Sequence, residues 1–232
     1  MRINGPRPAP TPREETDERQ KTYLLFGATG QTGKHFTSLA LQDGHRVRAL
    51  VRNPGKLAVD SPNLEVCQGS ITEVPGLDGL IDGVDAVVCL LGDAQVQKKR
   101  KINTAFVREL VPAMRRHGVT RLLYQAGGLS APPGQKLPPH LWALRHTVAR
   151  GYIGQHEDNE AVMRYLADDA MDIEWMVHRA GIGSDGPSKG VLERSASRIS
   201  MATFRDCASY DYQLLSDPAA VHTCDPSSYR KR

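Results

Sequence analysis

The sequence predicts an α/β protein built on one doubly wound parallel sheet, and three features support this fold class. Short apolar runs alternate with segments of helical periodicity along most of the chain, which is the pattern of βαβ units. Residues 85–91 form a nearly continuous apolar run, as expected for a strand that is buried on both faces of a parallel sheet. A cluster of glycines follows the first apolar run, where a first helix should begin.

The elements can be assigned in order along the chain. Strands are expected at residues 23–26, 46–51, 64–67, 85–91, 121–125, 173–178 and 221–224. Helices are expected at residues 35–42, about 74–81, about 101–117, from 144 or 148 to 166, and 204–215. Pro112 lies inside the third of these helices and should kink or loosen it.

Residues 22–232 are expected to form a single domain, with a small substrate-side segment at about residues 180–232. Residues 1–21 are rich in proline and charge and have almost no bulky apolar side chains, so this tail should be disordered. The remaining length is sufficient for one α/β core.

The composition narrows the classes of function. The net charge of +4 is small, and the basic run at residues 98–101 is short, so we expect no nucleic-acid partner. No apolar stretch approaches the roughly 20 residues that cross a bilayer, and the N-terminus lacks the apolar core of a signal peptide, so we expect no membrane partner and a cytoplasmic location. The four cysteines occur singly, so neither a metal site nor a disulfide framework is expected. The sequence gives no indication of the oligomeric state.

The most informative segment is the glycine-rich turn after the first strand, Gly27-x-x-Gly30-x-x-Gly33. A strand, a glycine turn and a helix N-terminus in this order form a phosphate site, because the free N–H groups and the helix dipole both favour an anion there. The glycines allow a tight turn, close approach of the backbone to a diphosphate, and close packing of helix on strand. Three polar residues of the turn can add hydrogen bonds to phosphate oxygens: Thr29, Gln31 and Thr32.

The segment G-A-T-G-Q-T-G that follows Y-L-L-F resembles the atypical short-chain dehydrogenase/reductases. The nearest groups are the NmrA-like proteins and the small flavin (biliverdin-IXβ) reductases. The resemblance covers about residues 22–224, and it implies a single Rossmann-type domain that binds NADP(H), with a small molecule as the substrate.

Arg52 bears on the choice of nicotinamide nucleotide. An acidic residue after the second strand would bind the ribose hydroxyls of NAD and repel a 2′-phosphate, but this chain has Arg52 there, with Lys56 nearby. Arginine suits phosphate, and in the resembled family an arginine at this position selects NADP. Further cofactor contacts are expected after strands three to five, at Ser70, Leu91, Gly92, Gln125 and Ala126.

The catalytic positions depart from the family pattern. The resemblance implies a serine after strand five and a Tyr-x-x-x-Lys pair on the next helix, but Ala126 or Gly127 occupies the serine position and no such pair occurs. In one alignment Tyr152 and His156 replace the pair. In the other, Gln155 and Asn159 do. A third interpretation is structural, with Tyr152 in the core and His156 as an ordinary surface or helix-capping residue.

The proline-rich and glycine-rich loops at residues 127–139 and 181–190 could close over a substrate, and His178 could contact it. The sequence as a whole predicts an NADPH-dependent oxidoreductase that reduces a small conjugated acceptor, such as a quinone, a flavin, an enone or a ketone. The alternatives are an NADP(H)-binding NmrA-like regulator without turnover, and an isomerase or cyclase on the same fold.

Overall fold

The structure is a computed structural model that describes residues 19–57, 59–73 and 76–230. The strands are β1 (Thr22–Phe26), β2 (Arg46–Val51), β3 (Leu64–Gln68), β4 (Ala86–Cys89), β5 (Arg121–Gly127), β6 (Glu174–Ala180), β7 (Ile182–Ser184), β8 (Leu192–Arg194), β9 (Ala202–Thr203) and β10 (Cys224–Tyr229). The α-helices are α1 (Gln31–Gln42), α2 (Leu77–Ile81), α3 (Ala94–Gln97), α4 (Ile102–Arg116), α5 (Pro139–His146), α6 (Ile153–Asp169) and α7 (Phe204–Leu214). Three short 3-10 turns are η1 (Pro54–Lys56), η2 (Arg150–Tyr152) and η3 (Pro218–Ala220).

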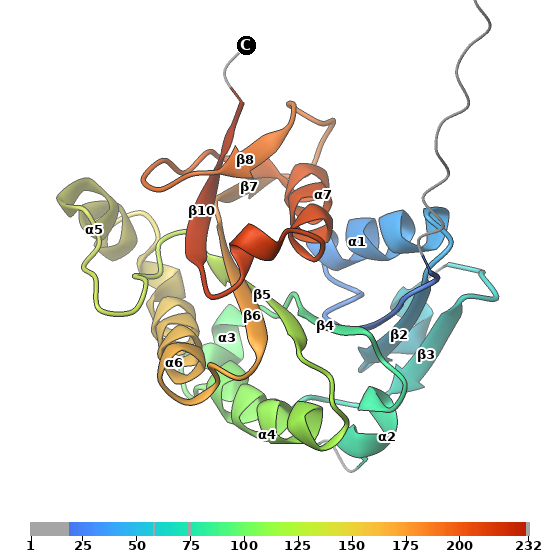
Figure 1. Cartoon of the computed structure of the whole chain (residues 1–232). Helices are drawn as coiled ribbons and strands as arrows, with labels where there is room; N and C mark the ends of the chain where they lie inside the picture. The colour runs from blue at the N-terminus through green and yellow to red at the C-terminus, as the bar shows by residue number, and fades with distance from the viewer. Residues whose placement is uncertain (1–18, 58, 74–75, 231–232) are drawn as a thin grey trace, which may run out of the picture.

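The central sheet confirms the predicted fold class. Its strand order is β3-β2-β1-β4-β5-β6-β10-β8, and every neighbouring pair is parallel except β10 with β8. The chain builds outward from β1 to β3 and then crosses back to β4 on the other side of β1 (Figure 1). This reversal of strand order places a crevice at the carboxyl ends of β1 and β4, which is where α/β sheets bind nucleotides.

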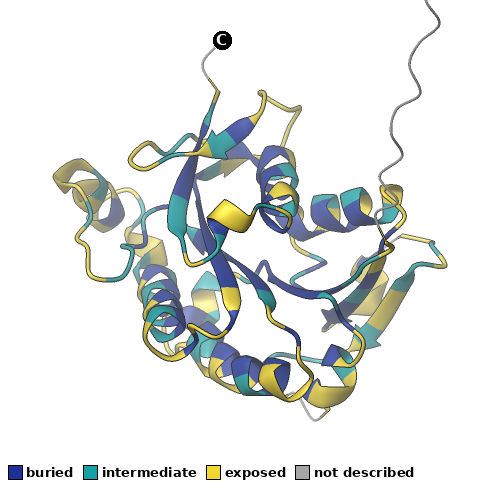
Figure 2. Cartoon of the chain, viewed as in Figure 1, coloured by how far each residue is buried: buried dark blue, intermediate teal, exposed yellow. Residues whose placement is uncertain are grey.

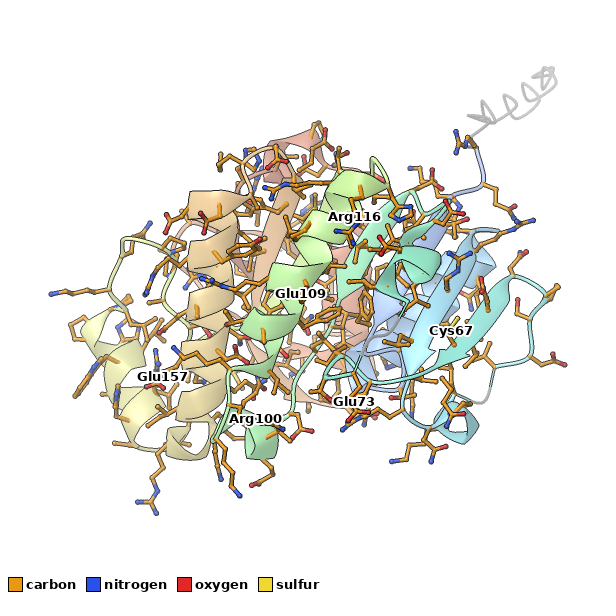
Figure 3. The ribbon with its side chains drawn as sticks, turned by 90° about the horizontal axis from the view of Figure 1, so that it is seen from below. Cys67, Glu73, Arg100, Glu109, Arg116 and Glu157 are labelled. Carbon is orange, nitrogen blue, oxygen red and sulfur yellow. The ribbon has the colours of Figure 1, made fainter. Side chains whose placement is uncertain are left out.

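Two apolar layers hold helices on both faces of the sheet. Because side chains alternate along a strand, Leu24 and Phe26 of β1 pack in one layer with α2, α4 and α6. Tyr23 and Leu25 pack in the other layer with α1 and α7. Figure 2 shows the buried residues concentrated along the strands and on the inward faces of these helices, and Figure 3 shows α4 and α6 side by side across the lower face.

The region between β5 and β6 differs from the prediction. The single helix expected from residue 144 or 148 to 166 is divided into α5, η2 and α6. A Cβ on Gly154 would lie 2.5 Å from the carbonyl oxygen of Gln97, so α6 begins where a glycine allows close contact with α3. By contrast, α4 runs through Pro112 without interruption.

The short elements α3, β7, β8 and β9 were not predicted, and the other differences concern where elements begin and end. Helix α1 begins at Gln31, inside the glycine motif, and β6 extends to Ala180. The closing strand was expected at residues 221–224, but β10 spans Cys224–Tyr229. Asp225 and Pro226 make this strand hard to predict from the sequence, because aspartate and proline are uncommon inside sheets. Residues 1–18 of the expected tail and residues 74–75 of the expected second helix lie outside the described residues.

None of the helices in the described ranges has the length and apolar composition that a bilayer crossing requires.

One buried carboxylate joins α6 to the start of α4. The side chain of Asp158 is fully buried, and it accepts hydrogen bonds from the backbone N–H groups of Asn103 and Thr104, both at 3.0 Å. The Thr104 hydroxyl and the Gln97 side-chain amide also donate to it, at 2.6 and 2.8 Å. Asp158 therefore caps α4 from outside that helix, and its negative charge faces the positive end of the helix dipole.

We expect Asp158→Ala to lower the free energy of unfolding by about 3 kcal/mol, because it leaves several buried donors unpaired. Urea unfolding followed by circular dichroism measures this change. Glu157→Ala is the matched control, because Glu157 is the exposed neighbour on the same helix and should change stability by less than about 0.5 kcal/mol. Equal effects for the two variants would contradict the capping role.

Candidate dinucleotide-binding and active site

The glycine-rich turn packs so closely on the sheet that two of its positions have no room for a side chain. Gly27 has a φ of +92°, and a Cβ there would lie 2.2 Å from the carbonyl oxygen of Leu90. A Cβ on Gly33 would lie 2.1 Å from the carbonyl oxygen of Gly27. Both separations are far inside van der Waals contact, so glycine is required for α1 to pack over the ends of β1 and β4.

The N-terminus of α1 is open toward the crevice. Gly30 is the N-cap residue and provides no side-chain cap, and the first turn contains no acidic residue. The N–H groups at the start of the helix have no intrahelical partner, and the helix dipole favours an anion in front of them. Gln31 is exposed at this end and Thr32 is buried in the first turn, while Thr29 lines the adjoining hollow. The N–H groups of the first turn of α1 are therefore available to bind a diphosphate.

A hollow of about 440 Å³ continues from the glycine turn across the neighbouring strand ends. Its walls come from the turn, from the segments after β2, β3 and β4, and from the start of α4. Three of the residues predicted to contact the cofactor line it: Ser70, Leu91 and Gly92. The Ser70 hydroxyl hydrogen-bonds the Thr72 hydroxyl at 2.9 Å. The position and size of the hollow suit a nucleoside.

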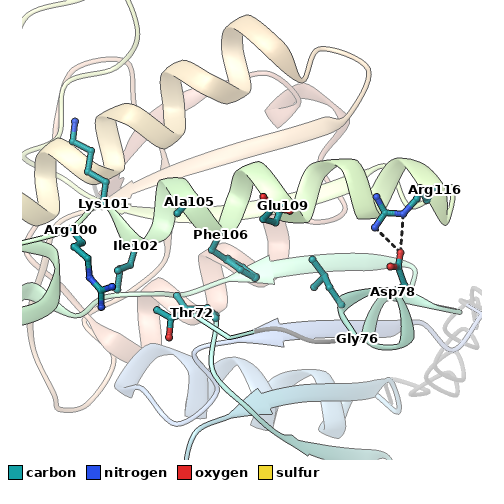
Figure 4. A pocket seen from close by; sticks show the side chains of 12 residues that line it. Thr72, Gly76, Asp78, Arg100, Lys101, Ile102, Ala105, Phe106, Glu109 and Arg116 are labelled. Atoms are coloured by element: carbon teal, nitrogen blue, oxygen red, sulfur yellow. Dashed lines mark hydrogen bonds and ion pairs between the residues drawn. The ribbon is translucent and has the colours of Figure 1, made fainter.

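A second hollow, of about 510 Å³, adjoins the first between α2 and α4 (Figure 4). The two hollows share four lining residues, Ile71, Thr72, Arg100 and Ile102. The second extends along α4 to Arg116, which donates to Asp78 at 2.8 Å. It therefore leads toward the C-terminal end of α4 and away from the carboxyl ends of the strands.

Arg52 stands at the mouth of the first hollow, directly after β2. Its side chain is 75% exposed, and its Nη1 lies 3.5 Å from Oδ2 of Asp93. Lys56 and Arg100 also line the hollow, so its charged lining consists of three cations and one carboxylate. Exposed ion pairs are weak, and the pairing with Asp93 leaves Arg52 able to turn toward a phosphate.

The inner end of the hollow leads to a chain of buried hydrogen bonds. Asn103 lines the hollow, and its Nδ2 donates to the hydroxyl of Tyr124 at 2.9 Å. The Tyr124 hydroxyl in turn donates to Oδ1 of Asn159 at 2.7 Å. Burial raises the pKa of Tyr124 well above its usual value, so this hydroxyl keeps its proton. These two hydrogen bonds link α4, β5 and α6 directly below the strand ends.

His156 and Ser130 form a buried polar pair beside these amides. The Ser130 hydroxyl lies 3.1 Å from Nδ1 of His156, Ser130 is fully buried, and His156 is 7% exposed. Burial, and secondly the positive charge of Arg145, lower the pKa of His156 to about 4, against an opposing effect of Glu160. His156 is therefore a neutral imidazole near pH 7.

The structure separates the residues of the two candidate alignments. Tyr152 is 54% exposed, so it is not a core residue, and the buried His156 is not a surface residue. The side chain of Gln155 lies 2.9 Å from the place of a Cβ on Gly92, and that of His156 lies 2.9 Å from the place of a Cβ on Gly127. Gln155 and His156 thus face the ends of β4 and β5. Catalytic roles for Tyr152, His156 and Asn159 stay predictions.

Gln125, at the end of β5, belongs to another buried network. Its Nε2 donates to Asp211 of α7 at 2.6 Å. The second carboxylate oxygen of Asp211 lies 2.6 Å from Nδ1 of His178, and Nε2 of His178 lies 2.8 Å from the Ser227 hydroxyl. His178 is therefore held inside the protein on the α7 face and is not open to a substrate. Ala126, the next residue, is buried on the opposite face, among the residues that pack with α4 and α6.

The first residues of the loop after β5 are fixed. Arg179 donates from Nη1 to the carbonyl oxygen of Ser130 at 3.0 Å, and the backbone N–H of Ala131 donates to Glu160 at 2.8 Å. Glu160 also pairs with Arg145 of α5. Movement of residues 127–139 as a lid, which stays a prediction, is consequently confined to the part beyond Ala131.

Sequence reasoning missed Ser130, Asn103 and Tyr124. Ser130 comes three residues after the end of β5, beyond the positions considered for the family serine, and a wider window after the strand would have included it. Asn103 and Tyr124 gave no signal, because an asparagine at the start of a helix and a tyrosine in a strand are ordinary. Within the described ranges, no group of three or more His, Cys, Asp or Glu side chains is arranged to hold a metal ion.

Comparison with known proteins agrees with this site. A family described as NAD(P)H-binding matches residues 27–217. The chain belongs to this family. The resemblance inferred from the glycine motif is thereby confirmed at the level of the NAD(P)H-binding family.

Similar proteins carry the names of dehydrogenases and reductases. A 3 beta-hydroxysteroid dehydrogenase/Delta 5-->4-isomerase of Mycobacterium tuberculosis is 31% identical over 125 residues, which are 49% of this chain and 34% of that protein. A (4-alkanoyl-5-oxo-2,5-dihydrofuran-3-yl)methyl phosphate reductase of Streptomyces griseus is 39% identical over 70 residues, 30% of this chain and 24% of that protein. The chain thus spans about a third or less of the length of these two curated relatives.

Among solved structures, the oxidoreductase ylbE of Lactococcus lactis superposes with a TM-score of 0.72 at 16% identity, over 90% of this chain and 91% of that one. This likeness shows the shared fold.

The depressed pKa of His156 makes stability depend on pH. Because the unfolded histidine binds a proton near pH 6.5 and the folded one only near pH 4, the unfolded state takes up more protons between these values, and stability falls as the pH falls through that window. We expect a loss of about 3 kcal/mol attributable to this group. Urea unfolding at pH 7.5 and pH 4 measures it. His156→Gln should remove this part of the pH dependence, and an unchanged dependence would disprove the assignment.

Proposed function

We propose that this protein is an NADPH-dependent oxidoreductase that reduces a small conjugated carbonyl or quinone-like acceptor. The observation that carries the proposal is the open N-terminus of α1 with the cation-lined hollow beside it. The Ser130–His156 pair, which joins the loop after β5 to α6, supports a reaction that transfers a proton. The names of the dehydrogenase and reductase relatives support the reaction class.

The residues of the crevice fit a dinucleotide. The open N-terminus of α1 and the glycine turn would hold the diphosphate, and the hollow behind Arg52 would hold the adenosine. Three cations against one carboxylate at the mouth of this hollow favour a 2′-phosphate, and hence NADPH over NADH. When bound, the nicotinamide supplies a hydride.

The Ser130–His156 pair provides a route for the proton that a reduced carbonyl oxygen requires. Ser130 is fully buried, so it can act only on an acceptor whose binding displaces the side chains that cover it. Its hydroxyl would then donate to the developing oxyanion while Nδ1–H of His156 passes its proton to Ser130. A proton from solvent enters at Nε2, which makes no hydrogen bond with the described residues, in the same concerted transfer, so His156 exchanges one neutral tautomer for the other. The low pKa of His156 suits this role, because the imidazole changes from one neutral tautomer to the other and does not accumulate as the protonated cation.

A dinucleotide-binding regulator without turnover remains the second candidate. The specific observation in its favour is that the side chain of Tyr152, the tyrosine of the first alignment, is exposed and its hydroxyl makes no hydrogen bond with the described residues. The two candidates separate when purified protein is mixed with NADPH and a panel of quinones, enones and ketones while absorbance at the wavelength of reduced nicotinamide is followed. Tight binding of NADPH without oxidation by any acceptor would favour the regulator. Isomerisation of an acceptor without net oxidation of NADPH would favour an isomerase or cyclase.

We expect Arg52→Asp to weaken NADPH binding by roughly 10- to 100-fold, because one charge-assisted contact to the 2′-phosphate is lost and a repulsion is gained. NADH binding should change far less. Isothermal titration with both nucleotides measures the ratio. Arg46→Asp, which reverses an exposed charge at the opposite end of the same strand, is the matched control. An unchanged preference for NADPH over NADH would show that Arg52 does not bind the 2′-phosphate.

We expect Ser130→Ala to lower kcat by about 100-fold or more while the Kd for NADPH stays within twofold, because the variant loses the proton donor and keeps the nucleotide pocket. His156→Gln should show a similar fall. Ser38→Ala, on the exposed side of α1, serves as the control. Full activity of Ser130→Ala would exclude the pair as the proton route.

A further inference from the structure

Two buried side-chain amides next to the nucleotide hollow have unused hydrogen-bonding atoms. Asn103 and Asn159 are 0% and 1% exposed, yet Oδ1 of Asn103 and Nδ2 of Asn159 have no partner among the described residues. Leaving a buried donor or acceptor unpaired costs about 1–3 kcal/mol, and native interiors avoid it. Such a pair of orphan groups on neighbouring residues indicates a ligand that supplies both a donor and an acceptor.

The direction of the hydrogen bonds between the two amides is fixed by chemistry. Nδ2 of Asn103 lies 3.5 Å from the carbonyl oxygen of Leu91, which can only accept, so the amino group of Asn103 faces Leu91 and Tyr124. The single proton of the Tyr124 hydroxyl then goes to Oδ1 of Asn159. The free groups are consequently an acceptor on Asn103 and a donor on Asn159, and flipping either amide would break an existing bond.

The two free groups belong to a rigid part of the molecule. Asp158 binds the backbone N–H of Asn103 at 3.0 Å and is the sequence neighbour of Asn159. Both amides therefore move as a unit with the α4–α6 junction, and a ligand meets them already oriented, which lowers the entropic cost of binding.

The amides lie between the nucleotide hollow and the Ser130–His156 pair. Asn103 lines the hollow together with Leu91 and Gly92. Asn159 lies 3.8 Å from the place of a Cβ on Gly127 and one helical turn from His156 on the same helix. A dinucleotide that extended from the glycine turn toward Ser130 would bring the sugar that carries its reactive ring to this point.

We propose that Asn103 and Asn159, joined through Tyr124, bind the vicinal diol of the nicotinamide-side ribose. Oδ1 of Asn103 accepts from one hydroxyl, and Nδ2 of Asn159 donates to the other. A diol matches both groups because each hydroxyl donates and accepts. This inference rests on the proposed function, since it takes the ligand to be NADP(H). It assigns the binding of this ribose to two neutral amides, because the chain lacks the Tyr-x-x-x-Lys pair of the resembled family.

The test compares two ligands that share the adenosine end. NADP+ contains the nicotinamide-side ribose, whereas 2′,5′-ADP ends before it. We expect Asn159→Ala and Asn103→Ala each to weaken NADP+ binding by about tenfold in isothermal titration, and to leave the Kd of 2′,5′-ADP within twofold. The double variant should lose less than the product of the two single losses, because both amides hold one diol. Asn63→Ala, at the start of β3 on the opposite edge of the sheet, is the matched control.

Tyr124→Phe is a second variant that should still fold, because it keeps the ring in the core and keeps both amides. It removes only the hydroxyl between them. It should also weaken NADP+ selectively, since the amides lose their fixed orientation. Unchanged NADP+ affinity in the single variants, or equal losses for both ligands, would overturn the inference and leave the proposed function standing. Failure of the unaltered protein to bind either ligand would instead overturn the proposed function.

Discussion

The Asp158 carboxylate is the contact on which the inner end of this site depends. It lies in α6 and accepts hydrogen bonds from free backbone N–H groups at the start of α4. These bonds set how the two helices are rotated and shifted relative to each other. The apolar layer around Phe106 and Met163 holds α4 and α6 against the sheet, but apolar contacts tolerate small rotations. Directional bonds to a buried charge do not, and they bring Asn103 and Asn159 to the same place from segments 56 positions apart in the sequence.

Much of the fold could be predicted because its local signals are strong. The apolar run at residues 85–91 and the Gly27–Gly33 motif have physical meanings that do not depend on the rest of the chain, and both led to the correct sheet and family. The contacts of Gly27 and Gly33 explain why this motif predicts the turn so well. The backbone carbonyls of Leu90 and Gly27 leave no room for a larger residue at these two positions. The cofactor contacts predicted at Ser70, Leu91 and Gly92 also came from strand ends, whose place in such a sheet is fixed by topology, and these residues line the hollow beside the glycine turn.

The surroundings of Ser130 and His156 were harder to predict, because they are assembled by contacts between distant parts of the sequence. Ser130 meets His156 where Arg179 of β6 and Glu160 of α6 hold the start of the loop after β5. No periodicity or spacing expresses that relation. Likewise, β10 is stabilised by its two neighbouring strands and by the bond of Ser227 to His178, although its own residues have low strand propensity.

The order Ser227–His178–Asp211 repeats the hydrogen-bond order of a hydrolytic triad, with separations of 2.8 and 2.6 Å. All three residues have zero solvent exposure, and the carboxylate also holds Gln125. A search of structures for nucleophile constellations by interatomic distance alone would retrieve this chain as an esterase or protease. Such searches need an accessibility filter, since the same three side chains, sealed inside a protein, act as an internal brace for the C-terminal elements.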